Sequence, residues 1–305
     1  MISLPAPGLK RQDMIDIDGL PALPVTSIRG LAEGPVVLVV SGVHGAEYVA
    51  IQALMEVAGG LEPSVVRGGL IMIHPVNPEG FRERRATVLP KDGRNINSLF
   101  YDDTYDGPAA RIARFVAGLQ STADFYLDLH TADLFEETAP LVCYPATGNE
   151  EVTQASRQAA LVVDAPLMIK SSMAGAGITE AAKRGLPALL IKRGGIGGAC
   201  PEAEVDLYRK DIINVLTHLG VLAGKPILPA RPPREVFPLY LRSARQGVWR
   251  PSVSPGQAVA AGQLLGVITD FFGHEAERFM AEKDGQVLYG LTALSASEGD
   301  ILLVY

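Results

Sequence analysis

A short apolar run near the amino-terminal end constrains the fold more than any other feature of the chain. Residues 35–40, Pro-Val-Val-Leu-Val-Val, are apolar throughout and rich in β-branched side chains, and Ser41-Gly42 end the run. A run of this length without polar alternation predicts a strand that is covered on both faces, as in parallel sheets. Similar apolar runs occupy residues 69–74, 125–129, 141–144, 167–170 and 188–191.

Segments with helical features separate these runs, at residues 46–58, 108–119, 150–163, 178–184 and 203–220. Strands that alternate with helices predict an α/β fold: a mixed, mostly parallel sheet with helices on both faces. Before the first buried strand we expect a strand near residues 25–29, and a proline-rich, irregular arm over residues 1–24.

The composition changes after residue 225. Residues 226–233 contain four prolines, which is typical of a linker, and the remaining chain consists of short apolar stretches separated by glycine turns. We therefore expect an α/β domain over residues 1–225 and a small β-rich domain over residues 226–305.

Two segments that follow predicted strands carry side chains that can bind a metal ion. His44 and Glu47 lie after the first buried strand, and their i, i+3 spacing lets both side chains reach one ion. His130 follows the run at residues 125–129 in the same way. Two histidines and one glutamate are a common catalytic zinc set, with a fourth position left for water. The pattern also occurs by chance, and a loop histidine is often only a hydrogen-bonding residue, so the residues alone leave both interpretations open.

The charge and the cysteine content exclude several other classes of protein. The formal net charge is −7 with a pI near 5.3, so neither nucleic acid nor an anionic membrane is an expected partner. No apolar run approaches the ~20 residues that cross a bilayer. The two cysteines, Cys143 and Cys200, predict no disulfide framework. We expect a cytoplasmic protein with a small-molecule substrate, and a homo-oligomer as one option for its assembly.

Four segments, in the same order along the chain, resemble motifs of one enzyme family. Residues 41–47 (Ser-Gly-Val-His-Gly-Ala-Glu) are similar to the G-x-H-G-x-E signature of the succinylglutamate desuccinylase/aspartoacylase family, relatives of the zinc carboxypeptidases. Residues 128–130 resemble its D-L-H motif, residues 92–97 its D-G-x-(D/N)-L-N-R segment, and residues 185–191 its G-I-P-A strand. The resemblance implies a carboxypeptidase-like fold with a small C-terminal β domain of barrel-sandwich type. It also implies a zinc-dependent amidohydrolase that removes an acyl group from a small N-acyl amino acid or related amide.

The resemblance also implies roles for several polar residues between positions 81 and 105. Arg85, with Arg84 as the second choice, matches an arginine that can stabilise an oxyanion. Asn95 and Asn97 are expected to contact the substrate. Where the family has an arginine that binds a substrate carboxylate, this chain has Ser98, and the nearby Arg94 is a possible replacement.

The most consequential departure lies at the end of the strand at residues 188–191. The family has a glutamate there that acts as general base, whereas this chain has Lys192, or Arg193 if the register is shifted by one residue. We expect Lys192 to enter the cleft, either as a neutral base or as a protonated group that binds an oxyanion or a carboxylate.

A carboxylate near the cleft offers another source for the missing base. Asp133, Glu136 and Glu137 follow His130, while His274 and Glu275 lie in a late loop that can reach the site but is more simply a surface loop. The alternative function is a diverged member that binds a small anionic ligand, or carries out a non-hydrolytic acyl reaction.

Overall fold

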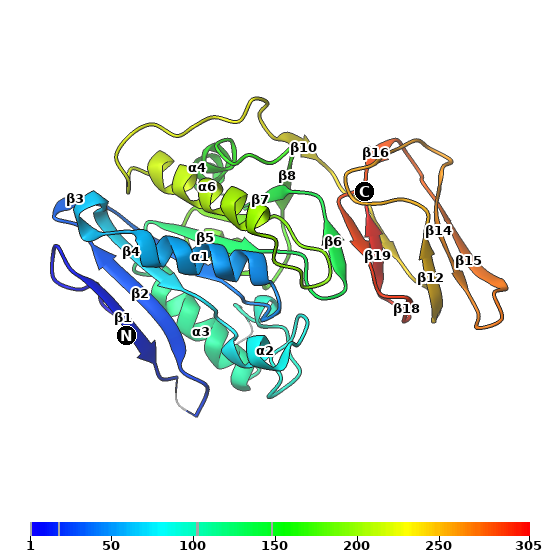
Figure 1. Ribbon diagram of the computed structural model, residues 1–305, viewed down its shortest axis with the longest axis horizontal. Coiled ribbons are helices and arrows are strands. Elements are labelled where there is room, and N and C mark those ends of the chain that lie inside the picture. Colours follow the sequence, from blue (N-terminus) through cyan, green and yellow to red (C-terminus); the bar gives the residue numbers. More distant parts are fainter. Residues whose placement is uncertain (1, 18, 102–103, 148) are drawn as a thin grey trace.

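The computed structural model describes residues 2–17, 19–101, 104–147 and 149–305. Figure 1 shows a large part built of helices and strands, with a smaller part made of strands beside it. A nine-stranded sheet runs through the large part in the order β1-β2-β4-β3-β5-β9-β7-β8-β10. Its strands are β1 (Lys10–Ile15), β2 (Leu23–Arg29), β4 (Arg67–Ile73), β3 (Ala32–Ser41), β5 (Phe125–His130), β9 (Ala188–Lys192), β7 (Leu141–Pro145), β8 (Leu167–Ser171) and β10 (Arg234–Val236).

The centre of the sheet is parallel, as the apolar runs predict. The parallel pairs are β4–β3, β3–β5, β5–β9, β7–β8 and β8–β10, and the antiparallel pairs are β1–β2, β2–β4 and β9–β7. Residues 37–40 of β3 have no exposed surface, which explains the absence of polar alternation in this run.

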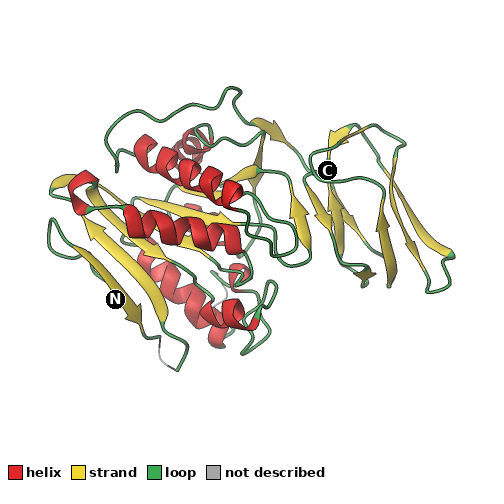
Figure 2. Cartoon of the chain, in the orientation of Figure 1, coloured by secondary structure: helices red, strands yellow, loops and turns green. Residues whose placement is uncertain are grey.

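Helices cover both faces of the sheet (Figure 2). One apolar core joins alternate strand residues, such as Val39, Leu127 and Ile191, to helices α1 (Tyr48–Gly60), α4 (Glu150–Ala160) and α6 (Glu202–His218). A second core lies on the other face of the sheet. It joins the strand residues in between, such as Leu38 and Tyr126, to α3 (Pro108–Gln120) and α5 (Gly177–Lys183). The predicted α/β fold with helices on both faces is therefore confirmed. None of the helices in the described part of the chain combines the length and the hydropathy that crossing a bilayer requires.

Two segments are more ordered than the sequence predicts. Strand β1 lies inside the expected irregular arm and pairs antiparallel with β2. Its residues, Lys-Arg-Gln-Asp-Met-Ile, are mostly polar and none is fully buried, because β1 is an edge strand. It therefore lacks the apolar pattern of a buried strand. The polar segment 81–105 includes the end of α2 (Pro78–Glu83) and the short 3₁₀ helix η2 (Ile96–Ser98).

The smaller part consists of antiparallel sheets with a core of their own around Trp249. Two four-stranded sheets have the orders β11-β19-β17-β6 and β15-β14-β12-β18, and β13 pairs with β16. The strands are β6 (Glu136–Thr138), β11 (Tyr240–Arg242), β12 (Gly247–Pro251), β13 (Ala258–Val259), β14 (Leu264–Thr269), β15 (Glu275–Met280), β16 (Gly285–Gln286), β17 (Tyr289–Leu291), β18 (Ser295–Ala296) and β19 (Ile301–Val304).

The two parts exchange strands across the predicted boundary at residue 225. β10 follows this boundary but pairs with β8 of the large sheet, and β6 precedes it but pairs with β17 of the small part. The proline-rich segment 226–233 is a loop, and the strands of the small part that follow it begin only after residue 236.

Candidate metal centre

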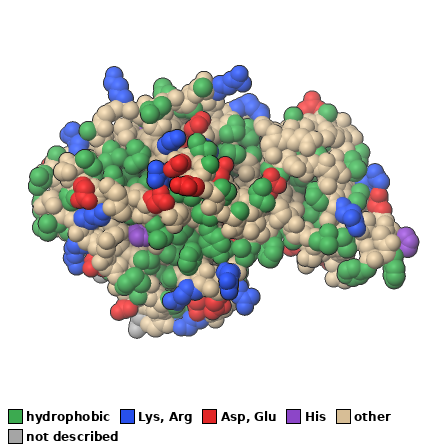
Figure 3. Space-filling model, viewed as in Figure 1, with side chains coloured by type: hydrophobic (Ala, Val, Ile, Leu, Met, Phe, Trp, Pro, Cys, Tyr) green, Lys and Arg blue, Asp and Glu red, His purple; other side chains and the backbone are tan. Residues whose placement is uncertain are grey.

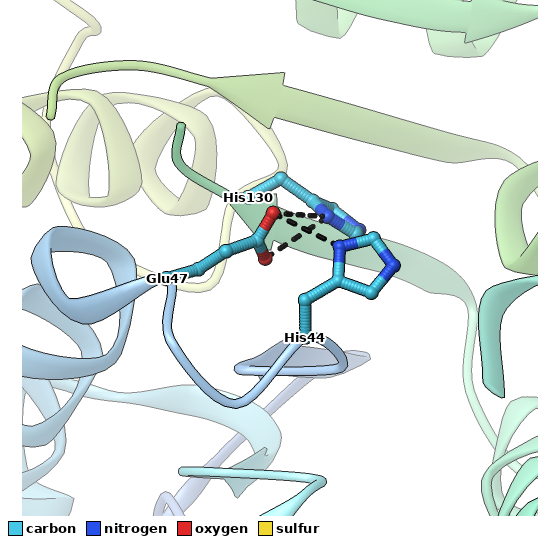
Figure 4. Close-up of side chains that lie close together, drawn as sticks. All are labelled: His44, Glu47 and His130. Carbon is cyan, nitrogen blue, oxygen red and sulfur yellow. Dashed lines mark hydrogen bonds and ion pairs between the residues drawn. The ribbon is translucent and has the colours of Figure 1, made fainter. Parts of the chain in front are cut away.

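His44, Glu47 and His130 converge at the ends of two adjacent parallel strands (Figure 4). His44 lies in the loop after β3, Glu47 is the residue before helix α1, and His130 is the last residue of β5. Strands β3 and β5 run side by side in the same direction, so their carboxyl ends lie at one edge of the sheet. Open α/β sheets bind their ligands at such an edge.

The distances between the three side chains fit a single ion. Nδ1 of His44 and Nδ1 of His130 each lie 3.1 Å from the Glu47 carboxylate, and the ligand atoms of the three residues fall within 4.8 Å of one another. A tetrahedral ion with ligand bonds of about 2.0–2.1 Å separates its ligand atoms by about 3.3 Å. The two distances to Glu47 are close to that value, and all three ligand atoms lie within 4.8 Å of one another, so the three residues can converge on a divalent cation that prefers nitrogen and oxygen ligands.

Each histidine uses its second ring nitrogen on a partner outside the triad. Nε2 of His44 lies 3.1 Å from Oδ1 of Asn95, and Nε2 of His130 lies 3.1 Å from Oδ1 of the buried Asp128. The Asn95 acceptor holds a proton at Nε2 of His44, and the charge of Asp128 favours a proton at Nε2 of His130, which leaves Nδ1 of each ring to bind a metal ion. Asn95, expected to contact the substrate, therefore positions a metal ligand in this structure.

Burial and opposite charge control the protonation of the triad. Burial opposes charge on both Glu47 and His130. Even so, the neighbouring histidines hold the pKa of Glu47 far below its usual range, and Glu47 with Asp128 raises the pKa of His130 to about 10. In the metal-free protein the triad is therefore a charged network, and a cation must displace a proton from His130 to bind there.

Lys192 ends strand β9 and pairs in register with His130. Its ammonium nitrogen lies 2.8 Å from Oε2 of Glu136 and 5.8 Å from the centre of the Tyr289 ring. Burial acts to lower the pKa of Lys192, but the carboxylates of Glu136 and Glu47 raise it above its ordinary value. Lys192 is therefore a cation in the metal-free protein, which favours the second of the two expected roles, a protonated group, over a neutral base.

Arg193 points to the opposite face of the sheet. Its Nε lies 2.7 Å from Oδ2 of Asp211 on helix α6, and both side chains are buried. The register is therefore not shifted, and the alternative that places Arg193 in the cleft is wrong.

The three carboxylates that follow His130 have different environments. Glu136 also accepts a hydrogen bond from the backbone N–H of Asp133. Asp133 accepts hydrogen bonds from the N–H and hydroxyl of Thr87 and from the N–H of Leu134, so it fixes a loop. Thr87 has a φ of +61°, a backbone conformation that is uncommon for a β-branched residue. Its hydrogen bonds to Asp133 help to hold the loop in this conformation. Glu137 alternates with Glu136 along β6, so it points to the other face of that strand.

The other predicted site residues make contacts outside the triad. Arg85 is exposed and lies 3.7 Å from the Glu83 carboxylate, while Arg94 lies over the Tyr105 ring. Oδ1 of Asn97 accepts a hydrogen bond from the N–H of Gly177, and the Ser98 hydroxyl donates to the carbonyl of Asn95. Exposed Arg84 adopts a left-handed conformation at the end of α2.

Two tyrosines near the triad were not identified from the sequence. The hydroxyl of Tyr208 on α6 lies within hydrogen-bond distance of the carbonyls of both His130 and Ile191, 2.8 and 2.7 Å away, and shares its one proton between them, so it ties together the ends of β5 and β9. Tyr289 belongs to β17 and reaches Lys192 only because β17 pairs with β6. A lone tyrosine far along the chain carries no sequence signal for such a role.

His274 lies in the exposed turn between β14 and β15, where it pairs with Asp270.

The cavities and the surface charge add little to the site. Two cavities of about 460 and 580 Å³ lie beside α6 and at the start of β3 and β4, and neither includes a triad residue. Three ligands that converge on one ion need no large cavity, so the position of the two cavities does not argue against the triad. On the face shown in Figure 3, basic and acidic side chains are interspersed rather than gathered into one basic patch.

Most of the chain is similar in sequence to known proteins. Residues 33–219 match the succinylglutamate desuccinylase/aspartoacylase catalytic domain. Over 298 residues the chain is 26% identical to the N-alpha-acetyl-L-2,4-diaminobutyric acid deacetylase of Halomonas elongata, covering 94% of this chain and 86% of that protein.

Two solved structures share the fold over nearly the whole chain. The succinylglutamate desuccinylase/aspartoacylase from Rhodobacter sphaeroides is 25% identical with a TM-score of 0.83, covering 97% of this chain and 94% of that one. The product-bound ectoine utilization protein EutE (DoeB) from Ruegeria pomeroyi is 24% identical with a TM-score of 0.88, covering 100% and 97%.

Proposed function

Because the chain belongs to the succinylglutamate desuccinylase/aspartoacylase family, we propose that it is a zinc-dependent deacylase. It cleaves a small N-acyl amino acid or related amide into a carboxylic acid and an amine. The observation that carries the proposal is the convergence of His44, Glu47 and His130, with the two histidines presenting Nδ1 to the same carboxylate.

Zinc is the cation that this set of ligands favours among the common ones. Two imidazole nitrogens and one carboxylate are typical of a catalytic zinc site, whereas calcium and magnesium prefer sites made of oxygen ligands alone. A bound zinc ion supplies a Lewis acid that polarises the amide carbonyl and lowers the pKa of water. His44, Glu47 and His130 hold the ion, while Asn95 and Asp128 keep the histidines in the tautomer that binds it.

The expected substrate carries at least one negative charge. The Halomonas elongata relative is named for an N-acetylated diamino acid, which has a carboxylate and a second amino group. Lys192 is a protonated side chain that interacts electrostatically with Glu47, so it can bind a carboxylate or a developing oxyanion. It stands where the family carries its glutamate, and a protonated lysine cannot accept a proton from water.

A substrate panel tests the proposal. Zinc-loaded protein is incubated with acetyl-, succinyl- and formyl-amino acids, including Nα-acetyl-2,4-diaminobutyrate, and release of the free amine is measured. We expect turnover of at least one acyl amino acid, and loss of that turnover on removal of zinc with a chelator. If no member of the panel is turned over, a second function is favoured: a protein that binds a small anionic ligand through Lys192. Ligand-induced changes in melting temperature with the same panel would then identify that ligand.

A further inference from the structure

The ion pair between Lys192 and Glu136 sits beside the metal triad. In-register partners on adjacent strands project to the same face of a sheet, so Lys192 lies on the side of His130. The charge of Glu47 influences the pKa of both members of the pair. The two side chains remain about one-fifth exposed, at 22% for Lys192 and 21% for Glu136, so they are neither sealed in the core nor fully in solvent.

Glu136 is held by one oxygen atom. Oε2 accepts hydrogen bonds from the Lys192 ammonium at 2.8 Å and from the N–H of Asp133 at 3.2 Å. Neither contact uses Oε1. The backbone of Glu136 is fixed as well, because β6 pairs with β17 and Glu137 forms a bridge with Ile196. Glu136 is therefore an oriented carboxylate with one oxygen available to another group.

Other carboxylates near the triad are already engaged. Asp133 is bound by Thr87 and Leu134, and Asp128 lies beside the Nε2 atom of His130, the nitrogen that faces away from Glu47. Glu137 points to the other face of β6. Among these residues Glu136 is the one with a carboxylate oxygen left for another group.

We propose that the pair divides two tasks: Glu136 accepts the proton of the attacking water, and Lys192 binds the carboxylate of the acyl amino acid. The inference rests on the proposed function. As the water oxygen bonds to the amide carbon, one O–H bond breaks and its proton moves to Glu136. When the C–N bond breaks, the same proton passes to the leaving nitrogen, so Glu136 ends the reaction as a carboxylate.

The ion pair with Lys192 also gives a way in which substrate binding makes Glu136 a stronger base. Lys192 holds the pKa of Glu136 below its ordinary value, against the opposing effect of burial. A substrate carboxylate competes with Glu136 for the ammonium, and Glu136 becomes a better proton acceptor as that contact weakens. Binding of the correct substrate would thereby activate the base.

Kinetics of Glu136→Gln and Lys192→Met separate the two tasks. Loss of a general base costs about 10²–10⁴-fold in rate, so Glu136→Gln should lower kcat by that factor and leave KM nearly unchanged. Loss of a charged contact should raise KM about 10–100-fold in Lys192→Met. The rise in KM should vanish for an N-acyl amine that lacks the carboxylate. Glu56→Gln, which breaks the surface pair with Arg209, is the matched control and should change neither constant.

Several outcomes would overturn the inference without touching the proposed function. Glu136→Gln with kcat within threefold of the wild-type value would refute the base assignment. An equal KM increase for substrates with and without the carboxylate would refute the role of Lys192. Zinc content and thermal unfolding are measured for every variant; if Glu136→Gln unfolds, Glu136→Asp is used, and it should retain more activity than Glu136→Ala.

An inactive wild-type protein would test the proposed function itself. Absence of turnover across the panel would contradict the proposed function, and the base role of Glu136 would fall with it. Calorimetric binding of N-acetyl amino acids to wild type and to Lys192→Met then decides the role of Lys192 independently. Equal affinities would refute it.

Discussion

His44 and His130 present the same ring nitrogen to Glu47, and each has an oxygen acceptor beside its other nitrogen. Asn95 lies in the loop before η2, whereas Asp128 lies two residues before His130 on β5. The ligand loop itself leaves no space for larger side chains, because a Cβ on Gly45 would lie 2.3 Å from the backbone of Gly80. Because each histidine has a second residue beside its other ring nitrogen, metal affinity should depend both on the ligands and on Asn95 and Asp128.

Substitution of either histidine ligand should abolish zinc binding. His44→Ala and His130→Ala each remove one of three protein ligands, so protein purified without added metal should contain about one zinc per chain only in the wild-type form. Metal analysis measures this directly. His274→Ala changes an exposed histidine outside the site and should keep its zinc. Equal zinc content in all four proteins would contradict the assignment.

Substitution of Asn95 should weaken zinc binding without abolishing it. Asn95→Ala removes the acceptor of the His44 Nε2 proton, and loss of such a partner typically costs about 10–100-fold in metal affinity. Competition with a zinc chelator measures the change. Asn97→Ala, which removes a contact to Gly177 instead, is the control and should leave zinc affinity within about threefold. Similar losses in both variants would indicate a general disturbance of the loop.

Zinc binding should release a proton at neutral pH. The pKa of His130 in the metal-free protein is raised to about 10, while zinc needs the neutral imidazole, so affinity should rise with pH until about 10. Calorimetric titrations at pH 7.5 in two buffers with different ionisation enthalpies should give different apparent heats, equivalent to about one proton per ion. Identical heats in the two buffers would argue against a protonated His130.

At the scale of elements, two consecutive basic residues at the end of β9 point to opposite faces of the sheet, because side chains alternate along a strand. Lys192 faces the same side of the sheet as His130, and Arg193 is buried against Asp211 of α6 on the other side. Asp211 also accepts the N–H of Asp164, so one carboxylate connects β9, α6 and the loop after α4. This pair anchors the strand that carries Lys192.

Removal of Asp211 should therefore be strongly destabilising. Asp211→Ala leaves the Arg193 guanidinium buried without its partner, and loss of one member of a buried ion pair costs about 3–5 kcal/mol. Urea unfolding measures the change in the free energy of unfolding. Asp206→Ala, on the exposed face of the same helix, should change it by less than about 0.5 kcal/mol. A small effect of Asp211→Ala would show that the pair contributes little.

At the scale of the whole molecule, the two parts are joined by shared strands and by a shared apolar cluster. β6 and β10 each pair with a sheet on the other side of the predicted boundary. Leu141 and Leu167 of the large part pack with Leu288 and Val304 of the small part. The contact between Tyr289 and Lys192 lies in the same region, so the small part helps to shape the site.

This arrangement predicts a single cooperative unfolding transition. The chain contains one tryptophan, Trp249, which is buried in the core of the small part, whereas the described helices lie between residues 48 and 218. Tryptophan fluorescence therefore reports on the small part, and circular dichroism at 222 nm reports mainly on the large one. We expect the two urea transitions to coincide. A fluorescence transition at clearly lower urea would show that the small part unfolds independently.

The sequence by itself determined the fold class and the segments that carry the triad. Continuous apolar runs predict strands buried on both faces, and their carboxyl ends mark the edge where ligands bind, so His44, Glu47 and His130 could be named from local patterns. Strand β1 was missed because an exposed edge strand needs no apolar pattern. The predicted boundary at residue 225 marks the change in composition, but not the exchange of β6 and β10.

Only the tertiary structure decided the partners of each charged residue. Lys192 and Glu136 lie 56 residues apart, and Asn95 lies 51 residues from His44. The sequence could not distinguish Lys192 from Arg193 as the residue facing the site, because a one-residue change of register exchanges the two faces of a strand. Pairing of His130 with Lys192, and burial of Arg193 against Asp211, fixed that choice. Such contacts depend on strand register and on packing between distant segments, which local residue patterns do not encode.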